Sequence, residues 1–205
     1  SNTITNSTAK NNDYGLYIYG NSDNNIINNS IFQNNSEAGL YLHNTTSSYP
    51  EYNHIYNCLF NNSGTYGNFR IDAGSHTNYW NTTKQVGERI YSGGNYIGGN
   101  YYTNSTGNGY SDTCEDSDLD GFCDSAYDVE NDASGCTSNN CDYLPLSDEY
   151  QEEVCISITD CTDITSPGDY CLTADITPSS PNFKSYCINI SANNVTLDCQ
   201  WHKIQ

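Results

Sequence analysis

Short stretches of alternating hydrophobic and polar residues recur along the first eighty residues of the chain. Leu16 and Ile18 alternate with Tyr17 and Tyr19, and residues 39–43 repeat this pattern. An alternation with a period of two is typical of a β-strand with one buried face. Longer stretches with a helical period are missing. The pattern therefore predicts a chain of short strands.

These strands belong to a longer repeat. Similar Asn-rich blocks occur at residues 2–12, 25–35 and 53–62, and a Gly-containing strand follows each of them. A fixed period of this length signals a solenoid. With two or three short strands per repeat, joined by Asn- and Gly-rich turns, it predicts an all-β, right-handed parallel β-helix.

The repeat also predicts which residues stack from coil to coil. We expect two interior rows, one at each of two strands, and one row of turn residues at which Asn adopts left-handed backbone angles. Tyr17, Tyr19 and Tyr41 should face outward, as an aromatic ladder or as a surface that stacks on sugars. The interior rows are Ile4, Ile27, Ile55 and Thr8, Ile31, Leu59, and the turn row is Asn6, Asn29, Asn57.

The pattern divides the chain into three parts. Residues 1–81 are the β-helix coils, and residues 82–148 form a loop-rich segment without the repeat. After a charged link, residues 149–205 resume short alternating strands, such as those at 154–158 and 186–190.

An acidic motif lies in the middle segment. Residues 116–124 read Asp-Ser-Asp-Leu-Asp-Gly-Phe-Cys-Asp, which matches the first three-quarters of an EF-hand-type loop. Calcium takes six to eight oxygen ligands, and carboxylates at alternate positions of a tight turn can converge on one ion. We expect a structural calcium ion bound by side chains and by the Phe122 carbonyl. The expected set is Asp116, Asp118, Asp120, Phe122 and Asp124, with Asp128 (or Asp112) in place of the missing twelfth-position glutamate.

Ten cysteines and no C-x-x-C pair indicate disulfides formed outside the cytoplasm. Cys114 and Cys123 bracket the acidic loop, and Cys136 and Cys141 enclose four residues, so both pairs are candidates for local bonds. The spacing leaves the other pairings open, including one bond between the coils and the C-terminal strands, within or between chains. The remaining candidates are Cys58, Cys155, Cys161, Cys171, Cys187 and Cys199.

Charge and composition exclude some classes of binding partner. Six Lys plus Arg against 25 Asp plus Glu give a net charge of −19, which argues against nucleic acid and anionic membranes. No apolar run is long enough to span a membrane. Sequons permit glycosylation, although their number barely exceeds chance; they are Asn6, Asn28, Asn34, Asn44, Asn61, Asn81, Asn104, Asn189 and Asn194.

Several of these motifs resemble a known family. Residues 193–204 (NNVTLDCQWHKI) are similar to the opening strand of NosD-like parallel β-helix proteins of archaeal cell surfaces, although Trp201 and Lys203 depart from the usual residues. Residues 25–35 and 39–42 resemble the coils of these proteins. Gly98–Tyr102, 109–112, the acidic loop and 142–146 resemble the segment that closes such a β-helix. The resemblance implies a parallel β-helix located at a cell surface. It also implies copper handling as a candidate function.

The order of the parts in this chain differs from the order that the resemblance implies, which is an opening strand, then coils, then a closing segment. Here the opening strand comes last. We therefore expect either a fragment of a tandem array or a subunit whose C-terminal strands complete the coils of its neighbour, which gives a head-to-tail homopolymer. No signal peptide opens the chain, so it is expected to be a mature product or a piece of a longer protein.

Three classes of function remain. The first is a structural subunit of an extracellular filament or surface layer, without catalytic activity. The second is a glycan-binding adhesin that uses the tyrosines. The third is a polysaccharide lyase or hydrolase, which is disfavoured because the acids of the coils do not recur in register. For copper, Met is absent, and only His43 and His54 of the four histidines (with His76 and His202) are placed to meet on one face.

Overall fold

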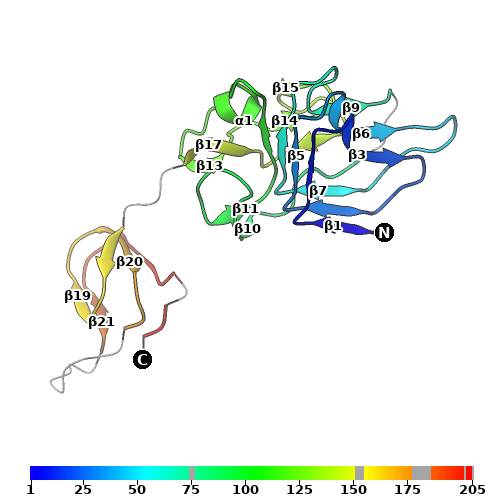
Figure 1. Cartoon of the computed structure of the whole chain (residues 1–205). Coiled ribbons are helices and arrows are strands. Elements are labelled where there is room, and N and C mark those ends of the chain that lie inside the picture. Colours follow the sequence, from blue (N-terminus) through cyan, green and yellow to red (C-terminus); the bar gives the residue numbers. More distant parts are fainter. Residues whose placement is uncertain (74–76, 151–154, 177–185, 201, 205) are drawn as a thin grey trace. The chain divides into compact units, whose positions relative to one another are not determined.

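A computed structural model of the chain describes residues 1–73, 77–150, 155–176, 186–200 and 202–204. The chain forms two compact units, residues 1–151 and 152–205. Nearly every element is a short β-strand (Figure 1). The parallel pairing described below confirms the predicted all-β parallel β-helix.

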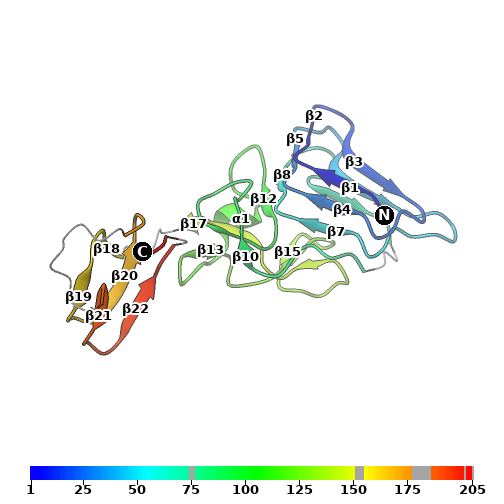
Figure 2. The same cartoon turned by 90° about the horizontal axis from the view of Figure 1, so that it is seen from below.

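Three parallel sheets build the β-helix of the first unit; each of the first three coils contributes one strand to each sheet, and β12 adds a fourth strand to the second sheet. Figure 2 shows strands of successive coils side by side. The first sheet holds β1 (Thr3–Thr5), β4 (Ile26–Asn28) and β7 (His54–Tyr56). The second holds β2 (Thr8–Lys10), β5 (Ile31–Gln33), β8 (Leu59–Asn61) and β12 (Tyr101–Thr103). The third holds β3 (Tyr14–Tyr19), β6 (Ala38–His43) and β9 (Phe69–Ile71).

Aliphatic and aromatic rows fill the interior. Ile4, Ile27 and Ile55 lie in register in neighbouring coils, as predicted, and Ile27 and Ile55 are fully buried. Phe32 and Phe60 stack in the next row with ring centroids 5.1 Å apart. Burial of such side chains is worth about 1.5–3 kcal/mol each, so these rows supply much of the stability of a chain with few aliphatic residues.

Asparagine ladders hold the turns. Asn6, Asn29 and Asn57 have φ values of 50°, 49° and 50°, which is the predicted left-handed conformation. At another turn, an asparagine side-chain oxygen of one coil accepts a hydrogen bond from the backbone N–H of the coil before it. Asn25 accepts from Asn2, 23 residues away, and Asn53 accepts from Asn25, 28 residues away. The ladder satisfies turn N–H groups that would otherwise be left without partners, and this explains the high Asn content.

The second sheet corrects one predicted row. Thr8, Ile31 and Leu59 are in register, but they belong to the outer face, and Phe32 and Phe60 point into the β-helix. Leu59 is nevertheless buried, because it packs in a second core with Tyr101, Phe122 and Leu146. The outer face of this sheet is therefore covered by residues of the closing segment (residues 82–148).

The closing segment is made mainly of short strand pairs and one helical turn. Besides β12, which belongs to the second sheet, its elements lie in sequence between β9 and the end of the first unit. They are β10 (Gln85–Val86), β11 (Tyr96–Ile97), α1 (Tyr110–Thr113), β13 (Asp120–Phe122), β14 (Tyr127–Asp128), β15 (Ala133–Ser134), β16 (Cys141–Asp142) and β17 (Leu146–Tyr150).

A buried polar contact joins this segment to the coils. The Asp142 carboxylate is completely buried and accepts hydrogen bonds from the Asn100 backbone N–H (2.8 Å), the Tyr102 hydroxyl (2.8 Å) and the Leu144 backbone N–H (2.9 Å). Asn100 in turn donates to the carbonyls of Ile55 and Trp80. The carboxylate thus connects the end of the closing segment to the last coils.

The second unit is a smaller set of parallel coils. Its first sheet holds β18 (Ile156–Ile158), β20 (Gly168–Leu172) and β22 (Val195–Asp198), and its second holds β19 (Thr162–Ile164) and β21 (Ile188–Ile190). Ile158, Ile164, Leu172 and Ile176 form its core. An Asn189–Asp163 contact spans 26 residues, within the range of the coil spacings in the first unit.

Candidate metal centre

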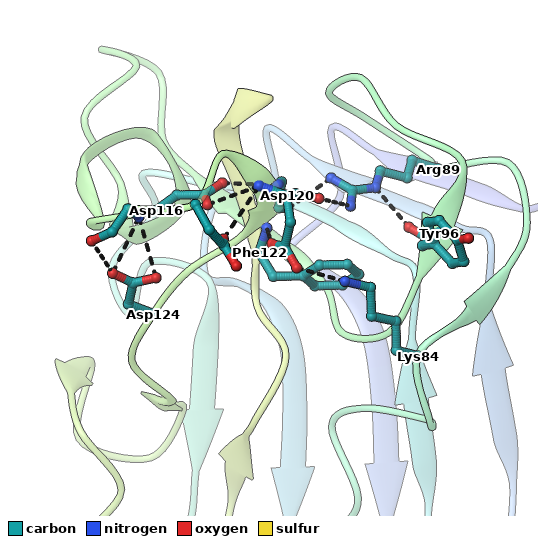
Figure 3. Close-up of polar contacts among 10 residues, drawn as sticks. Lys84, Arg89, Tyr96, Asp116, Asp120, Phe122 and Asp124 are labelled. Atoms are coloured by element: carbon teal, nitrogen blue, oxygen red, sulfur yellow. Dashed lines mark hydrogen bonds and ion pairs between the residues drawn. The ribbon is translucent and has the colours of Figure 1, made fainter. Parts of the chain in front are cut away.

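Three carboxylates of the acidic loop converge. Oxygen atoms of Asp116, Asp118 and Asp120 lie within 4.8 Å of one another, and this is the one group of at least three potential ligand side chains among the described residues. Asp116 is buried, Asp120 is partly buried and Asp118 is exposed. The structure thus brings together the three alternate aspartates of the motif, of which Figure 3 labels Asp116 and Asp120.

Local hydrogen bonds shape the turn. The Asp116 carboxylate accepts from the backbone N–H groups of Asp120 (3.1 Å) and Gly121 (2.9 Å), and the Asp120 carboxylate accepts from that of Phe122 (2.9 Å). Gly121 has a φ of +82°, and a Cβ there would lie 2.1 Å from an Arg89 nitrogen. Glycine is therefore required at this position both for the backbone angle and for space.

The electrostatics favour a cation. Burial raises the pKa of Asp116 above its ordinary value, and the nearby Asp120 charge adds to this rise. Like charges at about 4 Å repel by roughly 1 kcal/mol in water and by more in a protein environment. Oxygen-only ligands of this type suit a hard divalent ion such as calcium.

Two cationic side chains, Arg89 and Lys84, contact the acidic loop. Arg89 is buried and donates to the carbonyls of Tyr96 (2.7 Å), Gly121 (2.7 Å) and Asp120 (3.1 Å), and its guanidinium lies 4.5 Å from the Phe122 ring centroid. Lys84 lies 2.5 Å from the Asp120 carboxylate. Figure 3 shows both side chains reaching the loop. Sequence reasoning missed them, although they are the only Lys or Arg in residues 82–148.

Two further residues of the predicted ligand set lie nearby. Asp124 accepts hydrogen bonds from the Ser117 hydroxyl and backbone N–H and is not part of the three-carboxylate group. The Phe122 side chain is buried, and its carbonyl stays a predicted ligand. A disulfide between Cys114 and Cys123 brackets the loop, with a Cα–Cα distance of 5.6 Å.

The structure corrects the assignment of Asp128. This residue is buried away from the cluster, and its carboxylate accepts from Asn131, from the backbone and hydroxyl of Thr137, and from the hydroxyl of Ser138. Burial alone would raise the pKa of Asp128, but these hydrogen bonds together lower it well below its usual range. Asp128 organises its own loop. The alternative, Asp112, binds Tyr101, Thr103 and Gly109 instead.

Disulfides staple both units. Cys136 pairs with Cys141 in the closing segment, and the second unit holds Cys155–Cys171 and Cys161–Cys187. Cys58 and Cys199 are free. Cys58 is completely buried among the coils, and burial raises the pKa of its thiol to about 12. Cys58 therefore forms no bond with the C-terminal strands, which was one of the pairings that the spacing left open, and its burial makes it inaccessible to another chain.

The histidines do not meet. His43 ends β6 in the third sheet, and His54 begins β7 in the first sheet, where it packs on Tyr79 with ring centroids 4.6 Å apart. His202 lies 3.3 Å from Asp175 in the second unit. His76 lies outside the described residues. His43 and His54, the one pair that the sequence allowed to meet on one face, therefore lie in different sheets.

The sequons differ in exposure. Asn6, Asn34 and Asn194 are exposed turn residues with positive φ. Asn28, Asn44, Asn81, Asn104 and Asn189 use their side-chain amides as hydrogen-bond donors within the protein, and Asn61 is partly buried. Glycosylation is a prediction that the first three positions suit best.

Coils stacked in parallel and stapled by four disulfides define a β-helix protein that functions outside the cytoplasm. A family described as "Periplasmic copper-binding protein (NosD)" matches residues 1–107, which is more than half of the chain, so the chain belongs to this family. The acidic loop lies beyond the matched residues. No curated protein and no solved structure gives a significant match. No helix of the described residues is long and apolar enough to cross a membrane.

Proposed function

We propose that the protein is a structural β-helix subunit of an extracellular filament or surface layer, that its copies join end to end, and that calcium and disulfides stabilise its closing segment. The observation that carries this proposal is that both units are stacks of parallel coils with a similar spacing, so that the coils of one copy can continue those of another. β1, β2 and β3 are the edge strands of the three sheets, and no described strand lies beyond them.

Exposed groups at this end favour a further coil. The Asn2 carbonyl accepts from Ile26, so the Thr3 N–H points away from β4; likewise, the Ser7 carbonyl accepts from Ile31, so the Thr8 N–H points away from β5. A cavity of about 350 Å³ opens here, lined in part by Ile4, Leu16 and Ile18. Edge strands with free N–H groups beside apolar surface are templates for pairing with another chain.

The second unit is the proposed occupant. It consists of parallel coils with a spacing like that of the first unit, and its outermost strand β22 has a free edge among the described strands. Coils that match in direction and spacing can continue one another's ladders. In this proposal a second copy of the chain contributes the coil that pairs with β1, β2 and β3, and heterologous contacts of this kind propagate into filaments.

Copper does not fit the described residues. Copper sites use imidazole, thiolate or thioether ligands, but the chain has no Met, its free thiol Cys58 is buried, and neither the exposed thiol of Cys199 nor any described histidine belongs to a group of three or more potential ligands. The one described cluster offers carboxylate oxygens only. We therefore assign calcium to the acidic loop, and we propose no copper chemistry for this chain.

A structural role is also favoured over catalysis. The three aspartates of the coils are engaged in local contacts: Asp13 binds Ser36, Asp23 accepts from the Glu51 backbone, and Asp72 binds Tyr41 and Asn44. We propose that the protein is not an enzyme and that its archaeal-type surface location follows from the resemblance noted above.

Blocking the open end should prevent assembly. Thr3→Pro with Thr8→Pro removes two outward N–H groups and leaves the bonds to β4 and β5 in place, because proline is compatible with an edge strand. In sedimentation velocity over a range of concentrations, the wild type should form species larger than a dimer and the double variant should stay monomeric. The matched control, Thr3→Ser with Thr8→Ser, retains the N–H groups and should assemble. Equal assembly of the proline variant and the wild type would reject the open end as the contact.

A further inference from the structure

The outer face of the third sheet carries an unusual group of side chains. We define this tyrosine face by Tyr17, Tyr19, Tyr41, Tyr66, Arg70 and Asp72. Tyr17 and Tyr19 come from β3, Tyr41 from β6 and Arg70 from β9, and Tyr17, Tyr41 and Arg70 lie in one row of the sheet register. The opposite face of the same strands carries Leu16, Ile18, Leu40 and Leu42, which belong to the interior.

Three of the rings are open to solvent. Tyr17, Tyr19 and Tyr66 are 47%, 53% and 45% exposed, whereas Tyr41 is buried beneath its neighbours. The rings of Tyr17 and Tyr19 are nearly parallel, with an interplanar angle of 16° and centroids 6.2 Å apart. Tyr17 meets Tyr41 edge to face at 5.0 Å. These mutual contacts hold the exposed rings in place, so little side-chain entropy remains to be lost on binding.

Arg70 is held flat at one side of this face. Its guanidinium lies 4.3 Å from the ring centroid of Tyr41 and 4.5 Å from that of Tyr66, and it donates one hydrogen bond to the Tyr14 hydroxyl. Arg70 forms no ion pair with any described carboxylate. Since a guanidinium has five N–H donors in a fixed plane, several of them are available to a ligand.

The face is locally balanced in charge. The Asp72 carboxylate accepts from the Tyr41 hydroxyl (3.1 Å) and from the Asn44 backbone N–H (3.1 Å), and it lies 3.8 Å from His43. One arginine and one aspartate therefore face a ligand together, in a chain whose net charge is −19. Polyanions are repelled by this overall charge, and so is a second copy of the chain laid against the same face.

Polar and apolar groups of this kind match a sugar. A pyranose presents C–H groups on its faces, which are attracted to the negative face of an aromatic ring, and hydroxyls at its edge, which pair with guanidinium and carboxylate groups. The outward side chains of the three strands are mainly tyrosines, histidine and arginine, and Ala38, which is in register with Tyr14, is buried. This composition disfavours a hydrophobic protein partner.

We infer that the tyrosine face binds a neutral polysaccharide chain, with Tyr17 and Tyr19 stacking on sugar rings and Arg70 donating to their hydroxyls. This function goes beyond the proposed end-to-end assembly and does not depend on it, because the face lies on the side of the coils. The binding would attach the protein to a glycan layer.

Native affinity electrophoresis tests the inference, with soluble galactomannan, soluble mixed-linkage β-glucan or polygalacturonate cast into the gel. The variants are Tyr17→Ala with Tyr19→Ala, and Arg70→Gln. The matched control is Tyr143→Ala, which removes a tyrosine of the closing segment that is 63% exposed. Circular dichroism of each variant checks its fold, and the assembly-blocked Thr3→Pro/Thr8→Pro protein serves as the common background, so that polymerisation cannot mimic retardation.

We expect at least one neutral polysaccharide to retard the background protein and the Tyr143→Ala control equally. The tyrosine pair variant should bind at least tenfold more weakly, and Arg70→Gln several-fold more weakly. Retardation by polygalacturonate alone would overturn the assignment to neutral sugars. Absence of retardation in every gel, or retardation unchanged by the tyrosine pair variant, would overturn the inference as a whole.

Discussion

Calcium should raise the melting temperature of the wild-type protein by about 5–10 °C, and the substitution Asp118→Asn should abolish most of this gain. An ion at one hundred times its Kd stabilises the folded state by about 2.7 kcal/mol. For a chain of this size, each kcal/mol shifts the melting temperature by roughly 2–4 °C. Thermal melts followed by circular dichroism, with calcium and with a chelator, measure both quantities.

Asp118 is the cleanest position for this test. It is exposed, and its carboxylate takes part in one long hydrogen bond, 3.4 Å from the Asp120 backbone nitrogen. Asparagine is isosteric and removes one of the mutually repelling charges, so the calcium-free variant should melt at or slightly above the temperature of the calcium-free wild type. Asp169→Asn removes the same charge from an exposed position in the second unit and should retain the full calcium response. An equal response of Asp118→Asn and the wild type would reject the acidic loop as the calcium site.

Replacing Asp142 with asparagine should lower the free energy of unfolding of the first unit by about 3 kcal/mol. The Asp142 carboxylate is surrounded by donors from Asn100, Tyr102 and Leu144. An amide in its place must turn its NH₂ toward one of these donors, and a mismatched buried hydrogen-bond group costs about 1–3 kcal/mol, or more for a charged network. Urea unfolding at pH 8 measures the loss, again with Asp169→Asn as the control.

The same substitution should change the pH dependence. Burial raises the pKa of Asp142 to about 7, against an ordinary value of 3.8. Between these two values the folded state binds more protons than the unfolded state, so this residue makes stability fall as the pH rises from about 4 to 7. In Asp142→Asn this contribution disappears, and stability should vary less over that interval. An unchanged slope would show that Asp142 is ionised in the folded protein throughout.

The coil register could be predicted from the sequence, because stacking repeats the same residue type at a fixed spacing. Ile4, Ile27 and Ile55 follow this rule, and so do the left-handed asparagines of the turns. Which side chains of the second sheet point into the β-helix could not be predicted. Ile31 and Leu59 alternate with Phe32 and Phe60, and both sets are apolar because the closing segment covers the outer face. Alternation alone does not distinguish two buried faces.

The metal loop shows a similar limit. The three alternate aspartates converge because their spacing within a tight turn is local. Asp128 lies only a few residues away in sequence, yet hydrogen bonds from Thr137 and Ser138 hold it in another loop. Arg89 donates to the carbonyl of Asp120, thirty-one residues later in the sequence, and only the fold of the segment brings the two together. Contacts of this second kind depend on tertiary structure, and a single sequence carries no local signal for them.

Electron microscopy of the purified native protein, imaged with calcium and again after chelation, tests the central claim most directly. We expect long, uniform filaments in calcium that shorten or disperse once chelation loosens the closing segment, and no filaments from Thr3→Pro/Thr8→Pro. Dispersed single particles of the wild type in calcium, at concentrations where the protein is abundant, would contradict end-to-end assembly of the β-helix.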